Sequence, residues 1–129
     1  MFKSDSKPAR IDTLIAKSVK VHGGVEFAGG LHLDGQVAGG IRADPETPAS
    51  LSVSHTGSIE GPVEVTDLVL HGTVRGDIVA RGRVVLGASA RVEGNVYYGV
   101  IEMTLGAQIT GKLVRLTTGK PAQGAVEGS

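Results

Sequence analysis

The stretch LVLHGTVRGDIVARGRVVLGASARVEGNV, from Leu68 to Val96, contains two copies of one short unit. Each copy has two apolar residues flanking one position, then a turn of small residues, then two apolar residues flanking a glycine. The glycine-centred parts of the two copies are Val74, Gly76 and Ile78, and Val92, Gly94 and Val96. The stretch is therefore a tandem repeat.

The apolar-x-Gly-x-apolar signature occurs five times, centred on Gly39, Gly61, Gly76, Gly94 and Gly111. The steps between these glycines are 22, 15, 18 and 17 residues. One unit of this length cannot bury its apolar face alone, so repetition predicts a solenoid. Apolar residues alternate with polar ones within each unit, which is typical of short half-buried strands. The sequence predicts an all-β, single-domain parallel β-helix of about six coils.

Three parts of the chain follow from where this pattern begins and ends. We expect a flexible N-terminal tail over residues 1–15, a β-helix over 16–116, and a disordered C-terminal tail over 117–129, where the pattern is lost. At the end of the N-terminal tail, Ile11, Leu14 and Ile15 are spaced for one helical turn or an irregular lid over the first coil.

An insertion accounts for the longest step between signature glycines. The segment from Arg42 to Ser50 contains Pro45 and Pro48, which cannot both sit in a central ladder, so it is predicted to form an outward loop. Elsewhere the spacing from the preceding apolar residue to the signature alternates between four and six residues, ending with four from Leu105 to Ile109. Even spacings keep strand parity, so Leu105 is expected to face inward.

Composition narrows the functional classes. The chain has no Cys, which excludes disulfides and thiolate metal sites, and its 13 Lys and Arg balance 13 Asp and Glu, so no nucleic-acid partner is expected. No apolar run reaches the roughly 20 residues of a membrane span, and no signal-peptide pattern follows the start. We expect a cytoplasmic protein.

The first residues suggest contact with a lipid surface. Met1 and Phe2 are suited to insert at a membrane interface, while Lys3 and Lys7 are suited to meet anionic headgroups. An ordinary disordered terminus is the alternative. A single tail of this kind binds weakly, but many tails on one polymer bind strongly together.

No constellation of residues predicts catalysis or cofactor binding. The four histidines, His22, His32, His55 and His71, are interpreted as corner or solvent-facing residues rather than metal ligands. No Ser-His-Asp spacing, paired carboxylates or phosphate-binding loop stands out. Several arginines lie along the repeats, but interleaved Asp and Glu indicate a mixed solvated face. The sequence predicts no catalytic, cofactor or metal site.

The ends of a β-helix expose strand edges and an uncovered apolar cross-section. The candidate polymer contacts are, at the N-terminal end, Val19, Val21, Val25 and Phe27 and, at the C-terminal end, Leu113, Val114 and Leu116. The sequence therefore favours assembly of one chain upon another.

The short MF-K tail, the glycine-rich repeats of about 17–18 residues and the patternless ends resemble the bactofilins, a bacterial polymer-forming cytoskeletal family. The resemblance implies a right-handed β-helix that polymerises end to end, without nucleotide, into non-polar filaments. It also implies peripheral binding to the inner face of the cytoplasmic membrane through the N-terminal peptide, and positioning of cell-shape or polar proteins. The insertion and the 15-residue step depart from an even repeat and leave the coil register open.

A second interpretation belongs to another class of protein. The segment LGASARVEGNV, from Leu86 to Val96, also resembles the hexapeptide repeats of left-handed β-helix acyltransferases and related zinc enzymes. Those enzymes keep a strict six-residue phase, which this chain breaks at the insertion and at the 15-residue step. Filaments formed by the purified protein would support the scaffold interpretation, and discrete trimers would support the enzyme interpretation.

Overall fold

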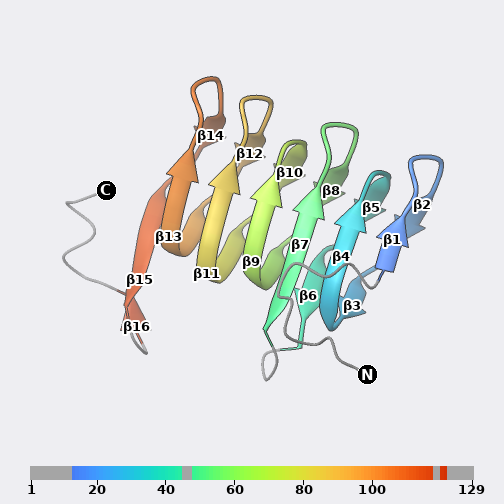
Figure 1. Cartoon of the computed structure of the whole chain (residues 1–129), viewed down its shortest axis with the longest axis horizontal. Coiled ribbons are helices and arrows are strands. Elements are labelled where there is room, and N and C mark those ends of the chain that lie inside the picture. Colours follow the sequence, from blue (N-terminus) through green and yellow to red (C-terminus); the bar gives the residue numbers. More distant parts are fainter. Residues whose placement is uncertain (1–12, 45–47, 118–119, 122–129) are drawn as a thin grey trace.

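The chain winds through stacked coils of short strands, and one coil after another lies side by side along the long axis of the molecule (Figure 1). The computed structural model describes residues 13–44, 48–117 and 120–121. Its elements in these residues are all strands, and every pairing between coils is parallel. The predicted parallel β-solenoid of about six coils is confirmed. Its right-handed sense stays a prediction.

Each coil crosses three faces in turn. The strands of coils one to three are β1 (Thr13–Ile15), β2 (Lys20–His22), β3 (Val25–Phe27), β4 (Gly29–Leu33), β5 (Gln36–Ala38), β6 (Ile41–Ala43), β7 (Ala49–Val53), β8 (Ser58–Glu60) and the start of β9 (Val63–Leu70). Coils four to six follow with the rest of β9, β10 (Thr73–Arg75), β11 (Ile78–Leu86), β12 (Arg91–Glu93), β13 (Val96–Met103), β14 (Gln108–Thr110) and β15 (Leu113–Thr117). A last strand, β16 (Lys120–Pro121), pairs antiparallel with β15.

The second face is the simplest, a six-stranded sheet in the order β14-β12-β10-β8-β5-β2. The first face contains β1, β4, β7 and the later parts of β9, β11 and β13, and the third face contains β3, β6, the earlier parts of those three long strands, and β15. The long strands turn the corner between the third and first faces. Their register shifts there, between Ala80 and Arg83.

Stacking lines up like residues into columns that fill the interior. On the first face one core column is Ile15, Leu33, Val53, Leu70, Leu86 and Met103. On the second face the core column is Val21, Val37, Ile59, Val74, Val92 and Ile109. On the third face it is Val25, Ile41, Val63, Ile78, Val96 and Leu113. Alternation along each strand points these side chains inward, as the sequence predicted.

The signature glycines form the corner between the second and third faces. Gly61 and Gly76 have φ angles of 149° and 156°, a conformation that side chains disfavour. A methyl group on Gly61 would lie 2.5 Å from the carbonyl oxygen of Gly39, one coil earlier. The repeat therefore needs glycine here for close stacking of backbone upon backbone as well as for the bend.

The N-terminal boundary of the solenoid was predicted wrongly. Leu14 and Ile15 lie in β1, a strand that pairs with Leu31–Leu33 of β4, and so they form neither a helical turn nor part of a tail ending at residue 15. Three residues are too few to separate the two periodicities, and pairing with the next coil decides for strand. Residues 1–12 lie outside the described chain.

The insertion and the C-terminal boundary also differ from the expectation. Ala43 and Ala49 are buried at the ends of β6 and β7, so the loop is shorter than the predicted Arg42 to Ser50, and its residues 45–47 lie outside the described chain. Beyond the predicted end of the solenoid, Thr117 and Lys120 pair in the β15–β16 hairpin. Residues 118–119 and 122–129 of the predicted C-terminal tail lie outside the described chain.

Leu105 does not face inward. Its side chain is 94% exposed in the turn of residues 104–107, where the Ala107 N–H donates to the Thr104 carbonyl at 3.1 Å. Met103, which pairs with Leu86, takes the place in the core column instead. The spacings from Met103 and from Leu105 to Ile109 are both even, so parity alone could not choose between the two residues.

Four-residue turns like that of residues 104–107 also connect the first and second faces in the first, third and fifth coils, and they project beyond the shorter turns (Figure 1).

Candidate assembly surfaces at the two ends

The interior columns are sealed in the middle of the molecule and open at its ends. On the first face Leu33, Val53, Leu70 and Leu86 are each 0% exposed, whereas Met103 of the last coil is 47% exposed. The half-buried hydrophobic residues that pack against the core come mostly from the first and last coils. An inner coil has a neighbour on both sides, and an end coil has one.

The N-terminal end surface consists of the first coil. The structure places Val21, Val25 and Phe27 there as predicted, half-buried and packed against the core. Val19 is 40% exposed in the preceding turn, where its N–H donates to the Ala16 carbonyl at 3.0 Å. Sequence reasoning missed Leu14, which is 58% exposed, because it had placed this residue in the tail.

The C-terminal end surface consists of the last coil. Of the predicted residues, Leu113 lies on a core column and is half-buried. Val114 points outward, because it follows an inward residue in the strand and pairs with the outward Tyr97. Leu116 lies past the pairing of β15 with β13 and instead pairs with Pro121 in the terminal hairpin.

The last coil also exposes apolar residues that sequence reasoning did not include. Ile101 and Ile109 are half-buried ends of core columns, and Val100 and Met103 are 49% and 47% exposed. The fully exposed turn residue Leu105 lies beside them in the chain. The VIEMTL hexapeptide, Val100 to Leu105, was a usable signal, since it is apolar at the last repeat with no further repeat to cover it.

The backbone at both ends is available as well. In the described residues β1, β2 and β3 pair only with β4, β5 and β6 of the second coil, and β14 pairs only with β12. Each of these strands therefore has one open edge. Open strand edges are templates for pairing with another chain.

Arginines and carboxylates of neighbouring coils alternate on parts of the lateral surface, as interpreted from the sequence. Arg75 lies 3.6 Å from Glu60 and 3.8 Å from Glu93, on the coils before and after it. Arg83 lies 3.1 Å from Glu102. These exposed ion pairs run across the coils and each contributes little to stability.

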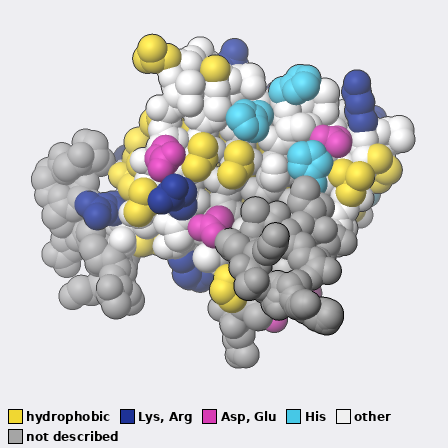
Figure 2. Space-filling model, in the orientation of Figure 1, with side chains coloured by type: hydrophobic (Ala, Val, Ile, Leu, Met, Phe, Trp, Pro, Cys, Tyr) yellow, Lys and Arg dark blue, Asp and Glu magenta, His cyan; other side chains and the backbone are white. Residues whose placement is uncertain are grey.

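Histidine side chains gather near the upper edge of the molecule in Figure 2. His32 Nε2 lies 2.9 Å from Asp34 Oδ1, and its Nδ1 lies 3.3 Å from the Ser52 hydroxyl. A hydrogen bond from Ser54, together with His32, holds the pKa of the Asp34 carboxyl below its ordinary value. Across the described ranges, no three His, Asp or Glu side chains converge as metal ligands would.

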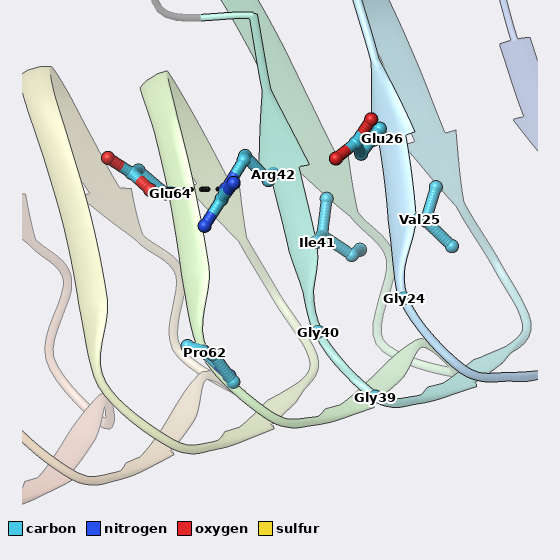
Figure 3. Close-up of a pocket in the computed structure, with 9 residues that line it drawn as sticks. All are labelled: Gly24, Val25, Glu26, Gly39, Gly40, Ile41, Arg42, Pro62 and Glu64. Atoms are coloured by element: carbon cyan, nitrogen blue, oxygen red, sulfur yellow. Dashed lines mark ion pairs between the residues drawn. The ribbon is translucent and has the colours of Figure 1, made fainter.

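A shallow hollow of about 390 Å³ lies on the outer side of the third face near the N-terminal end (Figure 3). Its floor is the glycine corner with Gly39 and Gly40, and Arg42 and Glu64 form an ion pair of 3.6 Å across it. Glu26 also lines the hollow, beside the Arg42–Glu64 ion pair.

The described residues contain no helix long and apolar enough to cross a membrane. The four predicted membrane-binding residues, Met1, Phe2, Lys3 and Lys7, lie outside the described chain.

A parallel β-solenoid whose end coils leave apolar core columns and strand edges open is typical of self-associating proteins. The family model described as "Bactofilin: Polymer-forming cytoskeletal" matches residues 13–114. The chain belongs to the bactofilin family. The family is cytoskeletal, so the comparisons lend no support to the hexapeptide-repeat enzyme.

A solved structure agrees. The chain is similar to the Thermus thermophilus bactofilin seen in a cryo-EM reconstruction of double helical filaments, with 28% sequence identity and a TM-score of 0.69. The match covers 80% of this chain and 98% of that one. Among curated proteins, none matches the sequence significantly.

Proposed function

We propose that this chain polymerises end to end, without nucleotide, into non-polar filaments that lie on the inner face of the cytoplasmic membrane. The filament binds anionic lipid through the N-terminal peptides and positions cell-shape or polar proteins. Membership of a polymer-forming cytoskeletal family supports the polymer. The filaments formed by the Thermus thermophilus relative support it too.

One observation carries the proposal: the three core columns run through all six coils and end in half-covered apolar residues at both ends. A soluble monomer would leave Met103 and Leu105 in water, at 47% and 94% exposure. Stacking a second chain on each end would cover them and complete the open strand edges. Burying one leucine side chain contributes about 2 kcal/mol, so an end with several such residues suits strong association.

The test of polymerisation uses side chains that the fold itself does not need. Leu105→Arg at the C-terminal end and Val19→Arg at the N-terminal end each place a charge in a proposed contact while changing an exposed position. An unpaired charge in a buried contact costs about 3 kcal/mol, so the critical concentration for assembly should rise about 100-fold. Sedimentation and negative-stain electron microscopy, with no nucleotide or metal added, measure it.

The matched control is Ser58→Arg, which adds the same charge on the outer side of the second face in the third coil. This variant should assemble like the wild type. Wild-type filaments from both end variants would refute the end-to-end arrangement. Discrete trimers from the wild-type protein would refute the filament itself.

The membrane tail is tested separately. Deleting residues 1–7 should leave filaments unchanged but abolish co-sedimentation with vesicles that contain phosphatidylserine, because the interfacial Phe2 and the basic Lys3 and Lys7 are gone. Neutral phosphatidylcholine vesicles are the control for charge. A truncated protein that still binds the anionic vesicles would show that another surface is the anchor.

A further inference from the structure

The outer side of the third face changes character along the molecule. Its central outward column reads, from the first coil to the last, Glu26, Arg42, Glu64, Val79, Tyr97 and Val114. The first three positions are charged, and Glu64 pairs with Arg42 at 3.6 Å and with Arg81 at 2.9 Å. The last three positions are apolar and half-buried. We call these three, Val79, Tyr97 and Val114, the apolar outer column.

The outward residues of the second face give a comparison within the same molecule, because nearly all of them are polar or charged. Its outward positions are Lys20, His22, Gln36, Ala38, Ser58, Glu60, Thr73, Arg75, Arg91, Glu93, Gln108 and Thr110. In this set Ala38 alone is apolar, and it is small. Two valines and a tyrosine stacked on the third face therefore depart from the pattern of the second face, and they exceed the outward pair Val69 and Val85 of the first face by an aromatic residue.

The surroundings of the apolar outer column resemble those of an interface. Val79 pairs in register with Glu64, whose carboxylate is held by Arg81, so a satisfied ion pair borders the column toward the N-terminal end. At the other end of the column Val114 lies in the last coil, and no further coil is stacked beyond it in the described residues. An apolar surface with an aromatic residue and a charged border on one side is common in protein–protein contacts.

We propose that the apolar outer column is the surface on which a second filament of this same chain docks laterally. The inference rests on the proposed filament and adds the face by which two filaments pair. The Thermus thermophilus relative was reconstructed as double helical filaments, so a second copy is the occupant with support. A column without charge is also complementary to itself, as contact between identical filaments requires. One column is small, but repetition along a polymer makes weak contacts strong together.

The experiment places a charge at the centre of the column. Tyr97→Lys puts an ammonium in the proposed contact, and Ser58→Lys puts the same group on the outer side of the second face. Negative-stain electron microscopy counts paired and single filaments in each. We expect Tyr97→Lys to form filaments of wild-type length, with the paired fraction at least about tenfold lower, while Ser58→Lys stays paired.

A second variant separates docking from sheet stability, because a Val–Tyr–Val column also stabilises a sheet through cross-strand contacts. Tyr97→Thr keeps a strong β-former and removes the aromatic surface. It should lower the paired fraction in a protein whose circular dichroism melting curve still shows a folded solenoid, and it carries the test if Tyr97→Lys does not fold.

Three outcomes overturn the inference. Equal pairing in Tyr97→Thr and wild type would show that the column only stabilises the sheet. Single filaments from the wild-type protein would show that no lateral docking takes place, while leaving the proposed function intact. Wild-type protein without filaments would refute the proposed function, and the docking surface with it.

Discussion

The central and the terminal coils are built from the same kinds of residue in the same columns, yet they end in different environments. Leu70 and Leu86 are 0% exposed, and Met103, the next residue in their column, is 47% exposed. The difference comes from the number of neighbouring coils rather than from residue type. The repeat itself therefore does not prevent another coil from stacking on each end. The end coils are either covered by a cap or joined to another copy.

The largest contrast is expected at the glycine corner. Gly61→Ala should lower the free energy of unfolding by at least about 3 kcal/mol, because the φ of 149° is strained for alanine and the new methyl meets the Gly39 carbonyl. Gly23 in the first coil has a φ of 106°, but a methyl group added there would have nothing within 4 Å. Gly23→Ala should therefore lower the free energy of unfolding by only about 1 kcal/mol. Urea denaturation followed by circular dichroism measures both. Equal losses of unfolding free energy in the two variants would show that backbone strain, and not close stacking of the coils, requires glycine at Gly61.

A smaller contrast is expected within one core column. Leu70→Ala should cost about 3 kcal/mol of unfolding free energy, because a sealed position cannot collapse around the cavity. Met103→Ala should cost about 1 kcal/mol in the dissociated chain, since half of the side chain is already in water.

Assembly should reverse the order of these two variants. Met103→Ala is expected to raise the critical concentration about tenfold, because the side chain meets the next chain, and Leu70→Ala is expected to leave it nearly unchanged. Sedimentation at a series of protein concentrations measures this. A Met103→Ala protein that assembles like the wild type would remove this residue from the end contact.

The smallest effect is expected on the outer side of the second coil. The Ser54 hydrogen bond and His32 hold the pKa of Asp34 below its ordinary value of 3.8, so the ionised carboxylate is favoured in the folded chain. Its contribution to stability is present above that ordinary value and is lost as the pH falls through the lowered pKa. Asp34→Asn should therefore flatten the acid end of the stability profile slightly. Thermal melts at a series of pH values above and below the ordinary value of 3.8 check it. An unchanged profile would show that Asp34 is not coupled to folding.

Much of the fold was predictable because its signals are local. Alternation along LVLHGTVRGDIV placed Leu68, Leu70 and Val74 inside, and the regular Gly61, Gly76 and Gly94 marked the corner. The end residues Val21, Val25 and Phe27 were found the same way, as the first repeat in a series. Leu14 and Leu105 were misplaced because three-residue strands and turns of even length leave the local pattern ambiguous.

The sequence by itself determined the repeat and the strand parity, because both are visible as spacings along the chain, and it marked the corner by its regularly placed glycines. The close approach of Gly61 to Gly39, which makes glycine necessary there, is a contact between coils. Only the tertiary structure decided that Met103 and not Leu105 completes the column, that Val114 faces outward beside Tyr97, and that Thr13–Ile15 is a strand. These depend on which residue lies one coil away, and the coils differ in length. The physical reason is that pairing with an adjacent coil, rather than local spacing, supplies the hydrogen bonds and the apolar cover that settle each position.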